Sequence, residues 1–339
     1  MLRHRVVLAS MALGGAIALD GGSGFVPVLA QYESSSAPSI QALLITKPHT
    51  VYAGSFGLGV FRSDDRGQSW VPVNSGLSDF FILSLATMED GTVYAGTFRA
   101  GVFRSQDKGK SWQAVNEGLK RLEIKALLID GHTIFAGTGD GVYRLERGEH
   151  KWAPVTKGLD ETLVHSLAIA ADRTLFAGTS GRGVFRYQVN APAWTRLTQG
   201  LVDHEGLVEN FIRVLAIDRD QALYAGTFDG GVFRSGDRGQ TWRPISRALP
   251  NDSIRGIVAS EKGLFVATGR GIFRSANEGR QWVPRNKGLT ELSVQVLVES
   301  GDGSFYAGTS RGIFRSDDGG ETWATASAGL EGVSGSPFR

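Results

Sequence analysis

Short apolar segments alternate with polar turns along the chain, and residues 124–155 show the pattern clearly. Apolar residues dominate four segments, which cover residues 124–129, 133–138, 141–144 and 152–155. Turns rich in glycine and charged residues separate these segments. No window keeps the 3.6-residue period of an amphipathic helix. The pattern therefore predicts four β-strands joined as an antiparallel meander.

The same unit recurs about once every 40 residues, and one tryptophan marks each copy. The seven tryptophans lie at positions 70, 112, 152, 194, 242, 282 and 323. Four strands in a period of this length are typical of a propeller blade. The sequence therefore predicts an all-β fold, a seven-bladed β-propeller of four-stranded antiparallel blades. First strands are expected near residues 40–45, 82–87, 124–129, 164–169, 212–217, 254–259 and 294–299.

The amino-acid composition agrees with one large domain and argues against some classes of binding partner. The 46 glycines among 339 residues are roughly twice the average share of ~7%, which suits a fold made of tight turns. The formal net charge is only +2 and no block of like charge occurs, so we expect no nucleic-acid partner. The absence of cysteine excludes disulfides and thiolate metal sites. We expect no cofactor.

The N-terminal residues resemble an export signal. Arg3 and Arg5 precede an apolar run over residues 6–19, and Ala30 ends a segment suited to signal peptidase. We expect a signal peptide at 1–30, a linker at 31–38, the propeller at 39–330 and a tail at 331–339. The alternatives are an uncleaved anchor or an N-terminal strand at residues 25–28. Export with or without cleavage predicts an extracytoplasmic protein, periplasmic or secreted. Cleavage of the signal peptide leaves no membrane span after processing.

Ring closure follows from where the repeats begin and end. The last repeat is complete, so no terminal strand is left to join the first blade to the last. We expect packing of the first blade against the seventh to close the ring alone. The alternative is an extra strand from residues 333–338 or from the segment near Phe25.

The turn before each tryptophan carries the most specific motif. Residues 63–70, 105–112, 235–242 and 316–323 fit the pattern Ser-x-Asp-x-Gly-x-Ser/Thr-Trp, and the sixth repeat substitutes Asn277 and Gln281. This motif resembles the Asp-box, also called the bacterial neuraminidase repeat. Its aspartate accepts backbone N–H bonds, its glycine permits an unusual backbone angle and its tryptophan packs the turn onto the sheet. A calcium site is not expected, because Asp64 and Asp65 offer two carboxylates where six or more oxygens are needed.

The resemblance implies a fold more than a function. Asp-box propellers include sialidases, xyloglucan-active glycosidases, sortilin-like receptors and photosystem II assembly factors, and their Asp-boxes lie away from the ligand face. Sialidases are similar to one another in a Phe/Tyr-Arg-Ile-Pro segment and a catalytic tyrosine. Here the Phe-Arg pairs recur in nearly every repeat without Ile-Pro. Five of the seven tyrosines, at positions 52, 94, 143, 224 and 306, occupy repeat positions that also hold phenylalanine. We therefore name no catalytic residue.

Positions at which the repeats differ indicate a site instead. Alignment of the first strands at their leading aliphatic residue places seven residues in one equivalent position: Gln41, Leu83, Lys125, His165, Arg213, Arg255 and Gln295. The first strand is innermost in a propeller, so we expect this ring near one mouth of the central channel. Converging cations attract carboxylate, sulfate or phosphate. The alternative is that these side chains are solvated and paired with nearby acids.

Loops on the same mouth complete the expected site. Phe56, Phe98 and Phe228 lie at loop tips, either buried under neighbouring loops or exposed as an apolar platform. We expect burial. A longer fifth repeat inserts residues 202–210, which bring His204 and Glu205 to the mouth.

Two classes of function fit these features. The first is an exported, non-catalytic binding or scaffolding propeller that recognises a glycan or protein partner with an anionic group. The second is a glycoside hydrolase of sialidase-like or xyloglucanase-like type. In it, Asp203, Glu205 or Glu209 would act with Asp160 or Glu161. The missing sialidase residues favour the first class.

Overall fold

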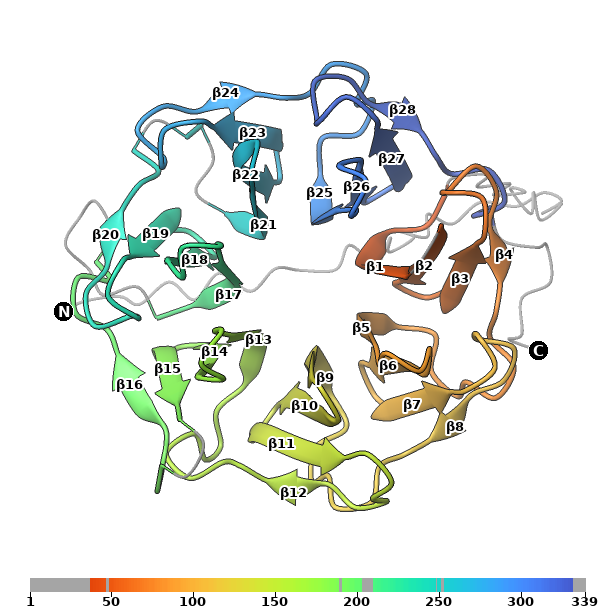
Figure 1. Cartoon of the computed structure of the whole chain (residues 1–339). Helices are drawn as coiled ribbons and strands as arrows, with labels where there is room; N and C mark the ends of the chain where they lie inside the picture. Colours follow the sequence, from red (N-terminus) through yellow and green to blue (C-terminus); the bar gives the residue numbers. More distant parts are fainter. Residues whose placement is uncertain are drawn as a thin grey trace, which may run out of the picture. The chain divides into compact units, whose positions relative to one another are not determined.

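In a computed structural model of the chain, the structure describes residues 37–46, 49–188, 191–202, 210–247, 249–250 and 253–331. These residues form seven four-stranded antiparallel sheets, each from consecutive strands, and no helix occurs among them. Figure 1 shows the seven sheets as blades around a central axis, with one first strand of each blade facing the centre. The predicted seven-bladed β-propeller is confirmed.

Each blade is numbered in chain order, and its strands run from the centre outwards. The first strands are β1 (Ile40–Thr46), β5 (Ile82–Thr87), β9 (Ile124–Asp130), β13 (Val164–Ile169), β17 (Ile212–Ile217), β21 (Ile254–Ser260) and β25 (Val294–Glu299). The second strands are β2 (Thr50–Ser55), β6 (Val93–Thr97), β10 (Thr133–Thr138), β14 (Leu175–Thr179), β18 (Leu223–Thr227), β22 (Gly263–Thr268) and β26 (Phe305–Thr309). All seven predicted first strands are confirmed to within one residue.

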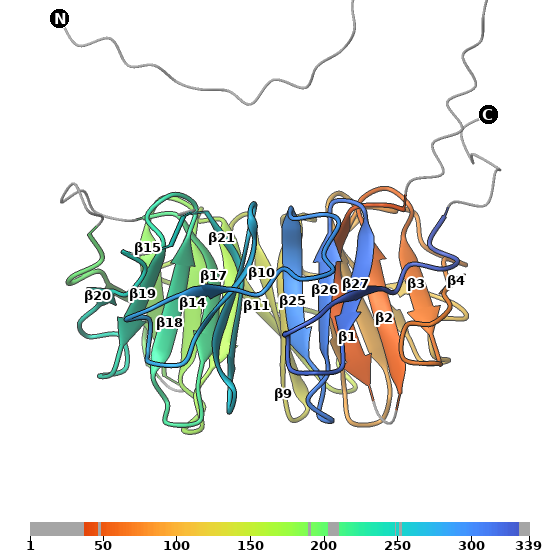
Figure 2. The ribbon, with the colours of Figure 1, turned by 90° about the horizontal axis from the view of Figure 1, so that it is seen from above.

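The outer half of each blade is shorter. The third strands are β3 (Val60–Ser63), β7 (Val102–Ser105), β11 (Gly141–Glu146), β15 (Gly183–Tyr187), β19 (Val232–Ser235), β23 (Gly271–Ser275) and β27 (Gly312–Ser316). The fourth strands are β4 (Val71–Pro72), β8 (Gln113–Ala114), β12 (Ala153–Pro154), β16 (Thr195–Leu197), β20 (Arg243–Pro244), β24 (Val283–Pro284) and β28 (Ala324–Thr325). Seen from the side, the longer strands run across the thickness of the ring (Figure 2).

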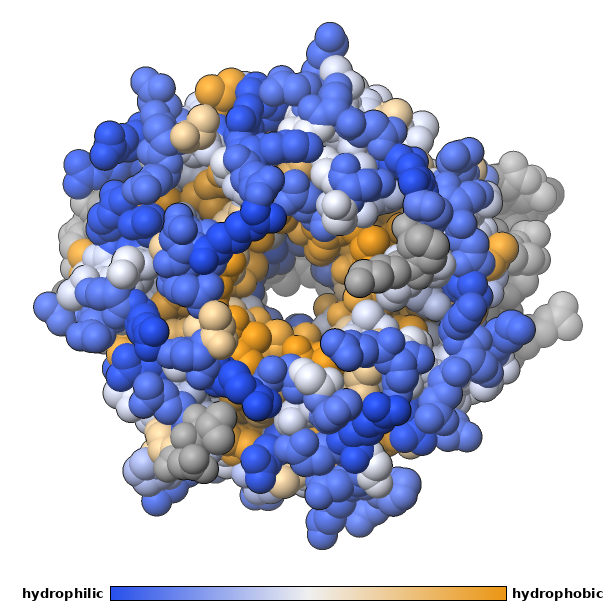
Figure 3. Space-filling view, in the orientation of Figure 1, coloured by the Kyte–Doolittle hydropathy of each residue, from blue (hydrophilic) through white to orange (hydrophobic). Residues whose placement is uncertain are grey.

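Strand register defines two faces of the ring. In blade 1, Ile40 pairs with Ser55 at one end of β1, and Thr46 pairs with Thr50 at the other end. The loops from second to third strands therefore lie on the face where the first strands begin, which we call the mouth face. The Asp-box turns follow the third strands and lie on the opposite face, which we call the Asp-box face. In Figure 3 one face of the ring is mostly hydrophilic, while hydrophobic residues line the wall of the central opening.

The hydrophobic cores lie between blades rather than inside them. One core joins Ile40, Val51 and Trp70 of blade 1 to Tyr306 and Ile313 of blade 7. The remaining six cores each likewise combine residues of two consecutive blades. A single blade thus leaves both apolar faces open, which is why the repeats stabilise one another only as a stack.

Tryptophan indoles tie six of the seven blades to the blade before them. The Trp112 indole Nε1 donates to the Val73 carbonyl at 2.7 Å, and its backbone N–H donates to the Ser75 carbonyl at 2.9 Å. The same pair of bonds closes the ring, because Trp70 Nε1 donates to Ala326 at 2.8 Å and Trp70 N donates to Ala328 at 2.9 Å. No further strand closes the ring among the described residues. Hydrogen bonds therefore accompany the packing of blade 1 against blade 7, which the sequence analysis did not anticipate. Residues 25–28 and 333–338 lie outside the described part of the chain.

The Asp-box turn is a closed set of hydrogen bonds. Asp237 accepts from the Thr241 backbone N–H at 2.8 Å and from the Thr241 and Ser235 hydroxyls. Ser235 accepts the backbone N–H of Gly239, which has a φ of 82°. These hydrogen bonds lower the pKa of the Asp237 carboxyl against the opposing effect of burial. Both carboxylate oxygens are occupied, which supports a structural role for the motif.

Candidate functional site at the channel mouth

A β-bulge near the start of every first strand produces the predicted ring. In blade 5, Ile212 pairs with Thr227 and Val214 pairs with Gly226, so Arg213 between them has no partner in the ladder. The same register shift occurs in all seven blades, and the unpaired residue is in each case the predicted one. A bulge turns the extra residue away from the sheet. Here it directs the side chains of seven blades towards one another at the mouth.

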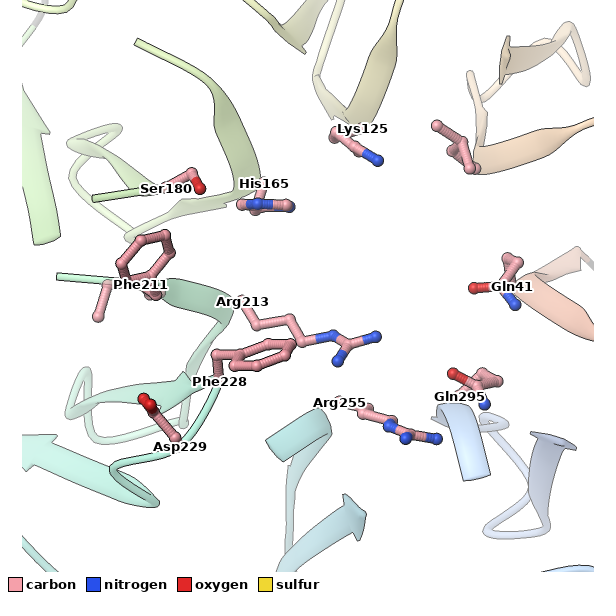
Figure 4. A pocket seen from close by; sticks show the side chains of 12 residues that line it. Gln41, Lys125, His165, Ser180, Phe211, Arg213, Phe228, Asp229, Arg255 and Gln295 are labelled. Atoms are coloured by element: carbon pink, nitrogen blue, oxygen red, sulfur yellow. The ribbon is translucent and has the colours of Figure 1, made fainter. Parts of the chain in front are cut away.

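These seven side chains line one pocket of about 610 Å³. Ser180, Phe211, Ile212, Phe228 and Asp229 complete its lining. Figure 4 shows Arg213 and Arg255 reaching towards the centre, with Lys125 and His165 on one side and Gln41 and Gln295 on the other. The cationic or titratable members come from consecutive blades 3 to 6, and the neutral ones from blades 7, 1 and 2. We call Lys125, His165, Arg213 and Arg255 the cation arc.

The two arginines of the arc have no acidic partner among the described residues. Burial, together with the neighbouring Arg255 charge, lowers the pKa of the Arg213 guanidinium to about 10. Burial also lowers the pKa of Arg255, which donates from Nη1 to the Ser293 hydroxyl at 2.8 Å. Its buried Nε has no hydrogen-bond partner in the part of the chain that the structure describes. Guanidinium groups held half-buried and without a carboxylate favour an anion from outside.

Lys125 and His165 differ from the arginines. Lys125 forms an ion pair with Glu123 at 2.9 Å and lies over the Phe98 ring, with 5.5 Å from Nζ to the centroid. The sequence analysis left such a pairing open as the alternative, and for Lys125 it holds. Burial and the charges of Lys125 and Arg213 lower the pKa of His165 to about 4, so its ring is neutral at pH 7.

The loop phenylalanines are exposed, so the expectation of burial is wrong. Phe56, Phe98 and Phe228 have 46%, 40% and 59% of their surface accessible. Phe228 lines the pocket, and Phe98 adjoins it through Lys125. Phe56 instead packs edge-to-face on Phe81, with 4.7 Å between ring centroids. Exposure of these tips depends on the loops of other blades, which the sequence of one repeat does not reveal.

Phe211 is a lining residue that the sequence analysis missed. It is 54% exposed, and its carbonyl accepts the Phe228 backbone N–H at 3.1 Å. Its position directly before β17, at the end of the long insertion, was the available signal.

The acids of the hydrolase hypothesis are only partly within the described residues. The part of the chain that the structure describes does not include Asp203, His204, Glu205 and Glu209. Asp160 accepts from the Gly158 N–H at 3.1 Å and from the Thr156 hydroxyl, so it serves the turn. Among the described lining residues, Asp229 is the one carboxylate. The hydrolase hypothesis therefore stays an untested prediction.

Five arginines of the Asp-box face are arranged differently from Arg213 and Arg255 at the mouth. There, arginines pair with acids of adjacent blades: Arg147 with Asp90, Arg173 with Asp130, Arg238 with Asp172, Arg219 with Glu261, and Arg66 with Asp302. These exposed pairs contribute little individually, yet each neutralises its arginine. Arg213 and Arg255 differ from these five arginines, because neither has an acidic partner among the described residues. No group of metal-ligating residues and no helix fit to span a membrane occurs within the described ranges.

Comparison with known proteins supports the architecture. Residues 314–325 match the BNR/Asp-box repeat. No curated protein matches the sequence. The extracellular domain of a one-component system from B. thetaiotaomicron is 20% identical, with a TM-score of 0.71 over 83% of this chain and 38% of that chain.

Two further structures show the breadth of this fold. The GH74 xyloglucanase from Xanthomonas campestris is 15% identical, with a TM-score of 0.69 over 87% of this chain and 55% of that one. YCF48 bound to D1 peptide is 14% identical, with a TM-score of 0.63 over 82% and 92%. The chain thus spans about 40–55% of the length of the first structures it matches. It is a seven-bladed β-propeller with Asp-box repeats, similar in fold to xyloglucanase and photosystem II assembly-factor propellers.

Proposed function

We propose that this chain is an extracytoplasmic, non-catalytic binding or scaffolding propeller. Its channel mouth holds the anionic group of a glycan or protein partner. The observation that carries the proposal is the pair Arg213 and Arg255, half-buried in one pocket and without an acidic partner among the described residues. Gln41 and Gln295 supply amide donors on the opposite side of the same pocket.

Related folds give this proposal precedent in several settings. One neighbour is an extracellular domain, one is bound to a peptide and one is a xyloglucanase. Identities of 14–20% transfer the fold alone. The binding role for this chain therefore rests on the chemistry of the mouth and on the signal-like N-terminus.

Substitution of a single mouth arginine tests the proposal. The probes are a fluorescent heparin hexasaccharide and a fluorescent deca-glutamate peptide, titrated against the full chain. Arg213→Gln or Arg255→Gln should weaken binding of the responding probe by about 2 kcal/mol, since each removes one charge-assisted contact. Higher salt should reduce the difference.

Arg238→Gln is the matched control, because it removes an arginine already paired with Asp172 on the Asp-box face. It should leave affinity within twofold of the parent. The proposal fails if neither probe binds, if the mouth variants bind as tightly as the parent, or if Arg238→Gln weakens binding equally.

Binding of a sulfated probe should tighten on acidification. A bound anion stabilises the imidazolium form, so it raises the pKa of His165 above its free value of about 4. Between these two values binding takes up a proton, and affinity increases as pH falls from 7 towards 4. Sulfate stays ionised throughout, so the probe itself adds no pH dependence.

His165→Asn is the variant that isolates this effect. Titrations at pH 7, 6 and 5 should show a smaller increase in affinity for the variant than for the parent. Equal pH profiles for the two proteins would contradict the assignment, because the change would then arise from groups other than His165.

A further inference from the structure

Exposed large apolar side chains gather on the mouth face. The described residues contain nine such side chains, and seven of them lie on mouth-face loops or directly before a first strand: Phe56, Leu58, Phe98, Leu122, Phe211, Phe228 and Leu292. The other two, Val71 and Val283, lie on the outer strands β4 and β24. A bias of this kind marks one face as an interaction surface.

Six of these seven side chains form two lobes on opposite sides of the central channel, and Leu292, before β25, belongs to neither. The first lobe comprises Phe56, Leu58, Phe98 and Leu122, from blades 1 and 2 and the start of blade 3. The second lobe comprises Phe211 and Phe228 of blade 5, joined by a backbone hydrogen bond of 3.1 Å. Blades 1 and 2 lie across the channel from blade 5 (Figure 1). An occupant that reaches both lobes therefore passes over the pocket that holds Arg213 and Arg255.

The residue types of the lobes distinguish between occupants. Sugar rings stack on flat aromatic faces and need hydrogen-bond donors and acceptors beside them for their hydroxyls. Branched side chains such as Leu58 and Leu122 offer no flat face, but they fit the aliphatic and aromatic side chains of a protein. An anionic membrane would favour cations on an outer rim, whereas these arginines are half-buried in a central pocket.

We propose that the partner held at the mouth is an acidic polypeptide segment. Its Asp or Glu side chains enter the pocket, and apolar residues on both sides of them pack on the two lobes. This inference rests on the proposed function and deepens it, because it selects the protein partner over the glycan. Charge complementarity with the arginines supplies orientation, and burial of the exposed phenylalanines supplies contact area.

A displayed library of random 12-residue peptides, panned against the immobilised full chain, tests this inference. Enriched peptides should contain Asp or Glu flanked by Leu, Ile, Phe or Trp. One enriched peptide is then synthesised and its affinity measured for the parent and variants. Phe98→Ala/Phe228→Ala and Arg213→Gln should each weaken its binding at least tenfold.

Val71→Ala/Val283→Ala is the matched control, because it removes two equally exposed apolar side chains from the outer strands. It should leave peptide affinity unchanged. All four phenylalanine and valine positions are exposed, so thermal melting should match the parent and show that each variant is folded.

Parallel arms separate failure of this inference from failure of the proposed function. Arg213-dependent binding of heparin hexasaccharide or of phosphatidylglycerol vesicles, without peptide enrichment, overturns the inference and leaves an anion-binding mouth. Peptide binding that Phe98→Ala/Phe228→Ala leaves unchanged overturns it too. A dimer in light scattering that Phe228→Ala dissociates would assign the lobes to a second copy, which is also contrary. If no probe depends on Arg213 or Arg255, both proposals fail.

Discussion

Trp70→Ala is expected to lower the free energy of unfolding by about 3–5 kcal/mol, the usual cost of deleting a buried tryptophan. The indole is 3% exposed and packs in the core between blades 1 and 7. Its removal leaves a cavity there and frees the Ala326 carbonyl that accepts from Nε1 at 2.8 Å. Urea denaturation followed by far-ultraviolet circular dichroism measures the change.

Trp112→Ala is the matched control for the position of the seam. Its indole makes the equivalent bond to Val73, but blades 1 and 2 are joined by the chain as well. Both variants should lose similar stability, whereas only Trp70→Ala should increase amide hydrogen exchange in both β1 and β25. Equal exchange in the two variants would show that the seam behaves like any other interface between blades.

Trp70→Phe separates the hydrogen bond from the packing, because it removes the Nε1 donor and keeps an aromatic ring in the core.

Trp242 packs like Trp70, yet its Nε1 has no hydrogen-bond partner among the described residues. The sequence therefore accounts for seven similar tryptophans but not for which of them donates, since the acceptor carbonyl lies on another blade.

The seven-fold repeat made the fold and the ring of candidate residues accessible from the sequence. Copies of one unit share one phase, so aligning Ile124 with Ile212 also aligns Lys125 with Arg213. What the alignment omitted is the bulge that turns these residues into the channel. A bulge places two residues of one strand opposite one residue of its partner, so only the pairing of the two strands reveals it.

The solvent exposure of the site residues and their interaction partners were harder to predict from the sequence than their positions. Phe98 and Phe228 look like core residues in sequence, because burial depends on the reach of loops from other blades. The Lys125–Glu123 ion pair joins residues two apart in sequence, yet its formation depends on how the chain turns directly before β9. The neutral ring of His165 follows from Lys125 and Arg213 on the two adjacent blades and from burial among them. Each of these properties arises between elements.

The second large loss of stability is expected on substitution of Gly226, where the second strand of blade 5 packs closely against the first strand of blade 6. A methyl group added there would lie 2.6 Å from Ile254 Cγ2 and 2.7 Å from Val214 Cγ1. It would also lie 2.9 Å from Ile254 Cβ, which cannot move without the backbone. Gly226→Ala should therefore lower the free energy of unfolding by about 3 kcal/mol, the upper part of the usual range for overpacking.

Blade 6 indicates how this cost can be recovered. There the equivalent residue is Ala267, which pairs with Gly256, and the next first strand begins with Val294 in place of isoleucine. The small residue has moved to the partner strand, and the neighbouring side chain has lost one methylene. Val214→Gly/Gly226→Ala/Ile254→Val reproduces this arrangement in blade 5.

The triple variant should regain part of the stability lost by Gly226→Ala, although Val214→Gly and Ile254→Val each destabilise the parent on their own. Such a gain requires strong coupling among the three sites, which their mutual contacts predict. Urea denaturation of the parent, single and triple variants measures that coupling. Additive losses would show that blade 6 accepts Ala267 for another reason, and a stable Gly226→Ala would show that adjacent blades separate enough to admit a methyl group.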